Sequence, residues 1–230
     1  MVLAGKIFLV NEDADLHLMA TKIKDYKAEE KNETDNISLV TQIKDLSFIG
    51  DSLQGSFLQD ELIDVYYHDK IVHIPSTLEA PFFFVKEKDR IVLTILEKKA
   101  KANQIANQLS KLLFITTGKI VEVGISPKVF KRFHEKNFED TKVIFFDDVD
   151  LPNINKLSLY GSALGNTSLY LDYLKHGKIW YTVLKSNRYG FIVGITRKGV
   201  VVIFSKAVKE DFINYIKEEV IPLIIETKEG

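Results

Sequence analysis

Three aspartates follow a predicted strand and are the candidates for metal ligands in this sequence. Asp147, Asp148 and Asp150 come directly after the apolar run Val143–Phe146. Carboxylates that collect at the carboxyl end of a strand suit magnesium chemistry, because Mg²⁺ prefers oxygen ligands. The same three residues also suit a turn and a helix N-cap, as aspartate does in loops. A metal-dependent enzyme that uses this cluster is therefore one functional hypothesis.

Basic and aromatic residues gather near two predicted hairpin turns in the last third of the chain. They are Lys185, Arg188, Tyr189, Arg197 and Lys198, close in sequence to Trp180 and Tyr181. Cations that contact phosphates, together with aromatic rings that stack on bases, are typical of a nucleic-acid-binding surface. The exposed ends of ordinary hairpins have the same composition. Nucleic-acid binding is thus a second hypothesis, and it predicts an affinity that falls steeply with salt.

The other residue types needed for catalysis show no recognised spacing. Cysteine is absent, which removes thiolate nucleophiles, Cys-based zinc sites and iron–sulfur ligation. None of the five histidines has a histidine partner at i, i+4. His68 and His73 flank a predicted turn, so they could form a two-histidine site with Asp69 or Asp64, although a solvated turn histidine and a sheet-surface histidine suit the pattern as well. The glycine-rich run 161–167 lacks the lysine of a phosphate-binding loop. We predict no cofactor and assign no catalytic or cofactor-binding residue.

The formal net charge of −1 conceals two oppositely charged parts of the chain. Residues 1–70 hold 7 lysines and 14 acids, whereas the remainder holds 24 basic and 18 acidic residues. Most of the basic excess lies in segments 86–136 and 156–210, which are the segments that a nucleic acid would contact. Opposed charge can form an internal interface or a face for a charged partner, and it can equally be solvated surface.

Length and composition favour a folded protein with a substantial core. The chain has 230 residues, of which 46% are hydrophobic, enough for one large domain or two small ones. No run of about 18 uncharged apolar residues occurs, and the short apolar start does not resemble a signal peptide. We therefore expect a soluble, cytoplasmic protein that does not bind a membrane. Abundant Lys, Glu and Ile without Cys are typical of a heat-adapted source.

Hydrophobic spacing predicts a strand, a helix and then a series of short strands in the first part of the chain. The strand lies at Lys6–Val10 and the helix at Leu16–Tyr26, although alternation leaves a strand possible there too. The polar run Lys27–Asn36 is expected to be a loop. The strands expected after it are Ile37–Ile43, Leu46–Ile49, Ser56–Leu58, Leu62–Tyr67 and Lys70–Ile74. Their expected separators are Gly50, Gly55, a tight turn at His68-Asp69, and a loop bracketed by Pro75 and Pro81.

The rest of the chain alternates between predicted hairpins and amphipathic helices. The expected elements are a hairpin over 82–96, helices over 102–113 and from Ser126-Pro127, strands at Val143–Phe146 and Leu157–Tyr160, a helix from Thr167 to Gly177, strands at Ile179–Leu184, Gly190–Ile195 and Val200–Phe204, and a final helix that Pro222 bends or ends.

Two segments separated by 108 residues correspond to each other. Arg90–Lys98 and Lys198–Lys206 both close a hairpin, end in lysine and lead into an amphipathic helix. At this offset Ile95 falls on Ile203. The correspondence indicates two copies of a sheet-plus-helix unit, although any hairpin followed by a helix would align in this way.

The segment Ile179–Ile224 resembles the second part of a repeat in the TATA-box-binding-protein superfamily. The resemblance covers about residues 167–224 and, more loosely, 82–113. It implies antiparallel strands that run into a long helix behind a saddle-shaped sheet. That family kinks DNA with paired phenylalanines. No such pair can be assigned here, because Phe82–Phe84 and Phe191 suit a core equally well, so the resemblance implies an architecture and no DNA-binding residue.

These patterns together predict an α+β fold, with a mostly antiparallel sheet, amphipathic helices packed on one face and two related hairpin–helix units. An acidic N-terminal part, 1–115, would precede a C-terminal α+β unit, 116–230. The leading functional hypothesis is a non-enzymatic binding or regulatory module that acts through a protein partner or self-association. It rests on the missing catalytic motifs and on the opposed charge of the two parts of the chain.

Overall fold

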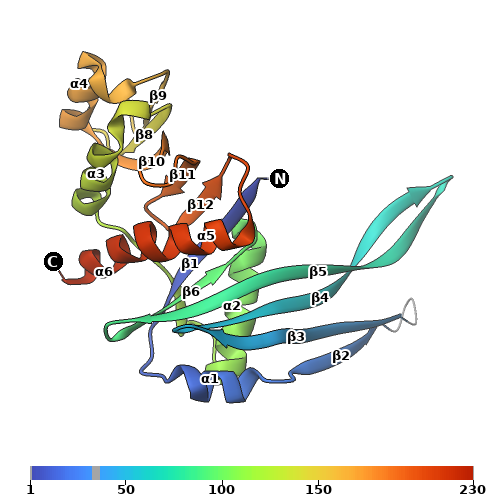
Figure 1. The fold of residues 1–230 in the computed structure, drawn as a ribbon. Helices are drawn as coiled ribbons and strands as arrows, with labels where there is room; N and C mark the ends of the chain where they lie inside the picture. Colours follow the sequence, from blue (N-terminus) through green and yellow to red (C-terminus); the bar gives the residue numbers. More distant parts are fainter. Residues whose placement is uncertain (1, 33–36, 230) are drawn as a thin grey trace. The chain divides into compact units, whose positions relative to one another are not determined.

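The computed structural model describes residues 2–32 and 37–229, and these fall into two compact units. One unit comprises the residues up to Phe8 together with those from Glu122 onward, and the other comprises Leu9–Val121. Each contains antiparallel strands and helices (Figure 1), which confirms the predicted α+β class. The units differ from the predicted parts 1–115 and 116–230 because the first strand contributes residues to the unit formed by the second half of the chain. No helix within the described ranges is long and apolar enough to cross a membrane.

The unit Leu9–Val121 contains strands in the order β2-β3-β4-β5-β6, together with two helices. The elements are α1 (Leu16–Ile23), β2 (Lys27–Asn32), β3 (Ile37–Ile49), β4 (Ser52–Tyr67), β5 (Lys70–Glu87), β6 (Arg90–Ile95), α2 (Lys99–Phe114) and the start of β7 (Ile120–Glu122). Asp15 caps α1, since its carboxylate accepts hydrogen bonds from the backbone N–H groups of His17 and Leu18 at 2.8 and 3.0 Å. The predicted helix is therefore confirmed over the alternative strand.

Strands β4 and β5 replace the series of short strands that the sequence predicts. They pair without interruption from Ser52↔Val85 to Tyr67↔Lys70. The predicted loop between Pro75 and Pro81 is wrong, because both prolines lie within β5. Proline is tolerated at a strand edge that needs no backbone donor, and β5 pairs with β6 only from Phe82 onward.

Gly55 is not a separator either, because it lies inside β4. A Cβ atom at this position would come within 3.0 Å of the ring of Phe82 and 3.1 Å of the side chain of Leu46. Glycine therefore serves close packing here and does not end the strand. Phe82, Phe83 and Phe84 are all buried, so these phenylalanines are core residues.

The predicted loop Lys27–Asn36 is also wrong over the part that the structure describes. Residues 27–32 form β2, which pairs with Ile37–Gln42 of β3, whereas residues 33–36 lie outside the described ranges. The strand is held by backbone hydrogen bonds at the border of the sheet, where polar side chains can face solvent on both sides. The two strands predicted between Ile37 and Ile49 are joined into β3 by a register shift between Lys44 and Ser47.

The other unit contains strands in the order β1-β12-β11-β10-β8-β9. Its elements are β1 (Leu3–Val10, up to Phe8), α3 (Pro127–Lys136), η1 (Phe138–Asp140), β8 (Val143–Asp147), β9 (Leu157–Tyr160), η2 (Leu164–Asn166), α4 (Ser168–His176), β10 (Lys178–Lys185), β11 (Ile192–Thr196), β12 (Val200–Ile203), α5 (Lys209–Tyr215), η3 (Ile216–Val220) and α6 (Ile221–Glu229). Ser126 caps α3 as predicted, accepting from the backbone of Val129. Lys6 in β1 is fully buried and forms an ion pair with Glu122.

The C-terminal helix continues past Pro222 because a π-helical turn precedes the proline. Proline lacks an N–H donor, and its ring clashes with the carbonyl four residues earlier in a regular helix. In η3 the backbone N–H of Ile221 bonds instead to the carbonyl of Ile216, five residues back. The wider turn accommodates Pro222, and α6 then extends to Glu229.

The turn between β11 and β12 depends on Gly199. This residue has φ +69°, a left-handed conformation that glycine adopts without a steric penalty. A Cβ atom here would lie 2.3 Å from Cγ2 of Val123 and 3.2 Å from the carbonyl oxygen of Ile7. Gly190, between β10 and β11, has a similar φ of +71°, but nothing lies within 4 Å of its Cβ position. The two glycines therefore share a backbone conformation and differ in packing.

His134 lies inside the same unit and is fully buried. Its Nδ1 is 3.0 Å from the hydroxyl of Tyr170, and its Nε2 is 3.0 Å from the hydroxyl of Thr141. Burial lowers the pKa of His134 to about 4, because the charged imidazolium loses its hydration. The side chain is therefore neutral at pH 7 and links α3 to α4.

Candidate interaction surface

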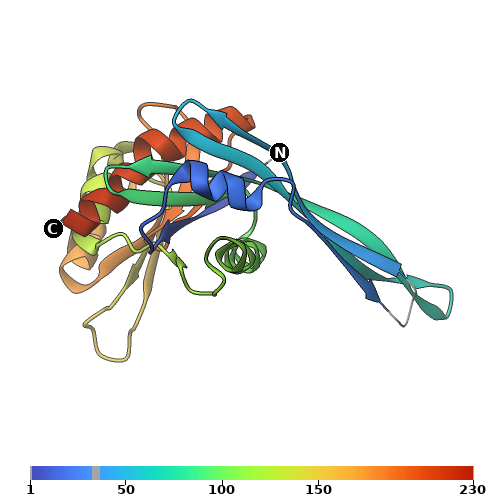
Figure 2. The ribbon, with the colours of Figure 1, turned by 90° about the horizontal axis from the view of Figure 1, so that it is seen from below.

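The hairpin of β4 and β5 continues beyond the rest of its sheet as a two-stranded arm (Figure 1). Strand β3 accompanies β4 only as far as Gln59, and β6 accompanies β5 only from Phe82. We call residues Asp60–Thr77 the arm. With a rise of about 3.4 Å per residue, its paired strands span roughly 25 Å. Figure 2 shows the same hairpin from below, extending away from the helices of its unit.

The turn at the end of the arm is the predicted tight turn at His68-Asp69. His68 adopts a left-handed conformation with φ 51°, as two-residue hairpin turns require of at least one central residue. The arm is thus a continuous hairpin.

Polar contacts fix the base of the arm. The hydroxyl of Thr77 donates to the carboxylate of Asp60 at 2.6 Å, and the backbone N–H of Val40 donates to the same carboxylate at 2.9 Å. Both hydrogen bonds lower the pKa of Asp60, because they favour the charged form. Glu61 forms an ion pair with Lys101 of α2. The arm therefore leaves its unit from an anchored position.

Side chains alternate between the two faces of the arm. Gln59 accepts a hydrogen bond from Gln108 of α2, and Glu61 forms an ion pair with Lys101 of the same helix. The odd-numbered residues of β4 therefore face the side of the sheet on which α2 lies. We call its continuation along the arm the helix-side face; it carries Ile63, Val65, Tyr67, Lys70, Val72 and Ile74. The opposite face carries Leu62, Asp64, Tyr66, Ile71, His73 and Pro75.

Apolar side chains of the arm are exposed on both faces. Tyr66, Tyr67 and Ile71 have 73, 65 and 62% of their surface exposed, and Ile63, Val72 and Ile74 are also exposed. No other part of the described chain covers them. Single exposed apolar residues are ordinary, but a contiguous apolar surface on a folded protein marks a site of interaction. The arm is therefore the candidate functional surface.

The sequence carries a signal that both faces of the arm are apolar, and the prediction of short strands makes no use of it. The segments 62–67 and 70–75 have equal length and flank a two-residue turn. Apolar residues occupy both odd and even positions in each segment, whereas a strand with one solvated face alternates between apolar and polar residues.

The predicted acidic cluster does not form a shared site. Asp147 pairs with Arg197, Asp148 with Lys178 at 3.0 Å, and Asp150 with His176 at 2.8 Å. Within the described ranges, no group of three or more His, Cys, Asp or Glu residues is placed to hold a metal ion. Each aspartate therefore has its own side-chain partner.

Replacing Asp147 with asparagine is expected to lower the free energy of unfolding by about 1–2 kcal/mol, since Arg197 loses a charged acceptor. Only 16% of the Arg197 side chain is exposed, so water replaces that partner poorly. Asp148→Asn is the matched control, because its pair with Lys178 is mostly exposed; its expected effect is within about 0.5 kcal/mol. Urea unfolding at pH 7 measures both. A rise in Tm with Mg²⁺ that Asp147→Asn abolishes would support the metal hypothesis instead.

The predicted nucleic-acid-binding residues lie at the two ends of β11. Lys185, Arg188 and Tyr189 adjoin the turn before this strand, whereas Arg197 and Lys198 lie in the turn after it. The five residues of β11 separate the groups by roughly 17 Å. The structure therefore places these side chains in two groups.

Four of these five residues already contact a carboxylate. Lys185 lies 3.9 Å from Asp140, Arg188 contacts Glu218 and Glu219, Tyr189 donates to Glu218, and Arg197 pairs with Asp147. Lys198 is exposed. A cation that is paired within the protein has less charge to offer a phosphate, so these contacts weaken the case for a nucleic-acid surface here.

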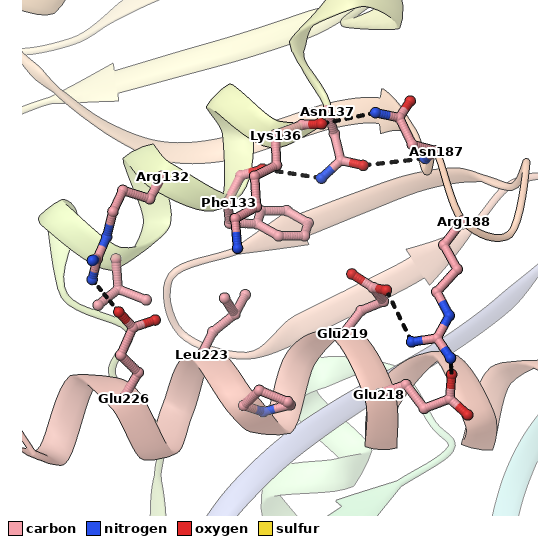
Figure 3. A pocket seen from close by; sticks show the side chains of 12 residues that line it. Arg132, Phe133, Lys136, Asn137, Asn187, Arg188, Glu218, Glu219, Leu223 and Glu226 are labelled. Carbon is pink, nitrogen blue, oxygen red and sulfur yellow. Dashed lines mark hydrogen bonds and ion pairs between the residues drawn. The ribbon is translucent and has the colours of Figure 1, made fainter.

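A cavity of about 430 Å³ lies between α3, the C-terminal helix and the β10–β11 turn. Figure 3 shows Arg188 reaching from the turn toward Glu218 and Glu219 on η3, at 2.5 and 3.8 Å. On the other side, Arg132 of α3 pairs with Glu226. The lining thus contains cations and carboxylates that neutralise one another.

Hydrogen bonds hold the β10–β11 turn against α3 beside this cavity. The side-chain amide of Asn187 donates to the carbonyl of Lys136 at 2.8 Å, and its backbone N–H donates to Asn137 at 3.1 Å. Burial raises the pKa of Glu219, while Arg188 opposes the shift. Since the polar groups largely satisfy one another, we assign this cavity no ligand.

Comparison with known proteins does not supply a function. No family model matches the chain, and no curated protein matches it. The arm and its chemistry therefore carry the functional proposal.

Proposed function

We propose that this protein is a non-enzymatic binding or regulatory module that acts through protein contacts made by its arm. The exposed apolar surface of the arm is the observation that supports this proposal. Removing apolar surface from water is favourable by about 25 cal/mol per Å², so contact with another apolar surface stabilises a complex. Tyrosine is also enriched in protein interfaces, and the arm presents Tyr66 and Tyr67.

The charge of the arm favours a protein partner over a nucleic acid. The arm contains four acidic residues, Asp60, Glu61, Asp64 and Asp69, and a single lysine, Lys70. An excess of carboxylates repels phosphates, whereas nucleic-acid-binding surfaces that use aromatic stacking combine it with positive charge. The basic segments 86–136 and 156–210 remain the alternative surface for nucleic acid, and loss of binding with salt would reveal it.

We also propose the finer architecture that the sequence predicts, with helices on one face of the sheet and two related hairpin–helix units. Two observations support it: β6 runs into α2 and β12 into α5, and the corresponding residues Ile95 and Ile203 are both buried. The similarity to the TATA-box-binding-protein repeat, a cytoplasmic location and a heat-adapted source belong to the same proposal.

Photocrosslinking tests whether the arm contacts protein. A photoreactive phenylalanine analogue placed at Tyr67 is expected to form protein adducts in an extract of the cells that produce this chain. The same analogue at Tyr160 is the control, because Tyr160 is 69% exposed and lies in the other unit. We expect at least a fivefold higher adduct yield at Tyr67, which an excess of unlabelled protein competes away.

Mass spectrometry then identifies what is attached. Equal adduct yields at the two positions, or adducts at Tyr67 that consist mainly of nucleic acid, would contradict the proposed function.

A further inference from the structure

We propose that the helix-side face of the arm packs against the same face of a second copy of this chain, in an antiparallel dimer with two-fold symmetry. This inference rests on the proposed function and names the partner. The two hairpins would form two layers about 10 Å apart, the spacing at which sheets pack face to face.

The helix-side face suits a dry interface better than the opposite face does. Its central cross-strand pairs are entirely apolar, namely Ile63 with Ile74 and Val65 with Val72. At the same level, the opposite face carries the carboxylate of Asp64, hydrogen-bonded to His73 with Nδ1 and Oδ1 2.7 Å apart. Covering that pair would remove its hydration, which is costly for charged groups. The apolar cross-strand pairs therefore favour the helix-side face as the interface.

Charge at the two ends of this face favours a second copy in the antiparallel direction. Glu61 lies at the base of the arm and Lys70 lies at its tip, on the same face. Antiparallel packing about a two-fold axis midway between Ile63 and Val65 places each Lys70 at the level of Glu61 of the other copy. Glu61 keeps its own partner, Lys101, and a second cation adds to that attraction. Parallel packing would instead bring the two lysines together.

The exposed area is sufficient for a weak dimer. On this face Ile63, Val72 and Ile74 are 46, 41 and 42% exposed, and Tyr67 is 65% exposed. With full side-chain areas of ~100 Å² for aliphatic and ~200 Å² for aromatic residues, each copy offers roughly 260 Å² of apolar surface. Two copies together offer roughly 520 Å² of apolar surface, which is less than the ~1,200–2,000 Å² buried in specific, stable complexes and fits a weak dimer. We therefore expect a dissociation constant on the order of 10 µM.

Two neighbouring substitutions on one strand test the face. Val72→Lys places a charge on the helix-side face, whereas Ile71→Lys places the same charge on the opposite face. Both residues are exposed and lie far along the arm, so neither variant should disturb the core. Sedimentation equilibrium of the full chain from about 1 to 300 µM brackets the expected constant. We expect the native chain and Ile71→Lys to dimerise, and Val72→Lys to dimerise at least 100-fold more weakly.

The charge arrangement has its own test. Lys70→Glu should weaken the dimer at least tenfold, because it brings the introduced carboxylate of each copy near Glu61 of the other. The loss should shrink at high salt, since screening reduces the repulsion. Thermal unfolding of each variant, compared with the native chain, verifies that the fold is retained.

The outcomes separate this inference from the proposed function. A native chain that stays monomeric at 300 µM, or dimers that Val72→Lys leaves intact, would overturn the self-association proposed here. If the native chain is monomeric and Tyr67 still crosslinks to a different protein, the proposed function stands, and only the identification of the partner as a second copy is wrong. If Tyr67 forms no protein adduct either, both fail.

Discussion

Gly199→Ala is expected to lower the free energy of unfolding by about 3 kcal/mol. A left-handed conformation costs a non-glycine residue about 1–2 kcal/mol, and overpacking adds about 1–3 kcal/mol. The packing cost is specific to this position, because an added Cβ would lie 2.3 Å from Cγ2 of Val123. The Cβ cannot move far from Val123, since the carbonyl oxygen of Ile7 lies only 3.2 Å away. Urea unfolding at pH 7 would show the loss as a lower midpoint with an unchanged slope.

Gly190→Ala is the matched control for this change. Gly190 has nearly the same φ as Gly199 but open space at its Cβ position, so only the conformational cost of about 1 kcal/mol should appear. The difference between the two variants isolates the packing at the β11–β12 turn. Equal losses would show that Val123 moves aside freely and that this turn is not tightly packed.

The second large effect is a loss of stability in acid that depends on His134. Its pKa is about 4 in the folded protein and about 6.5 in an unfolded chain. Between these values the unfolded state binds more protons, so the free energy of unfolding falls as the pH falls from 6.5 to 4. The full contribution is about 3 kcal/mol, and it is lost once the pH is below 4.

Urea unfolding between pH 4 and 7.5 measures this dependence. His134→Gln should flatten it, because glutamine can still hydrogen-bond to Tyr170 or Thr141 but does not titrate. A His134→Gln variant that keeps the native pH dependence would show that other groups cause the acid sensitivity.

Local signals in the sequence predicted most of the helices. The starts of three predicted helices coincide with side-chain caps at Asp15, Ser126 and Thr167, and a capping side chain acts on backbone groups only two or three residues away. The same local rules predict that Pro222 bends or ends the last helix, and they do not predict the π-helical turn that precedes it. Local chemistry therefore located the helices better than it located their irregularities.

The length of the strands was harder to predict, since it depends on neighbours that are distant in sequence. Pro75, Pro81 and Gly55 are ordinary strand breakers, and all three lie within long strands here. The two prolines are tolerated because β5 pairs with β6 only from Phe82 onward, so their missing N–H groups are not needed there. Gly55 is tolerated because the ring of Phe82 occupies the space that a side chain would need. The sequence predicts the strands and the turn of the arm, but not their extension beyond the neighbouring strands, which depends on the same long-range pairing.

The predicted site residues illustrate the same limit. Asp147 and Arg197 are 50 residues apart in sequence, and each was assigned to a different hypothesis. The structure pairs them with each other, which removes the charge that either hypothesis needs. Composition alone cannot reveal such a pairing, because it reports the charges present and not their partners.

The bare edges of the arm determine what kind of assembly its hairpin permits. An unpaired strand edge can recruit further strands without limit, which leads to fibres. Pro75 has no backbone N–H group, so the row of hydrogen-bond donors along β5 has a gap at this residue. Asp60 and Asp64 add negative charge to β4. Growth by strand addition is therefore obstructed along both edges. In the proposed dimer, contact through the helix-side face closes after one partner, so that pairing gives a finite complex and not an open-ended polymer.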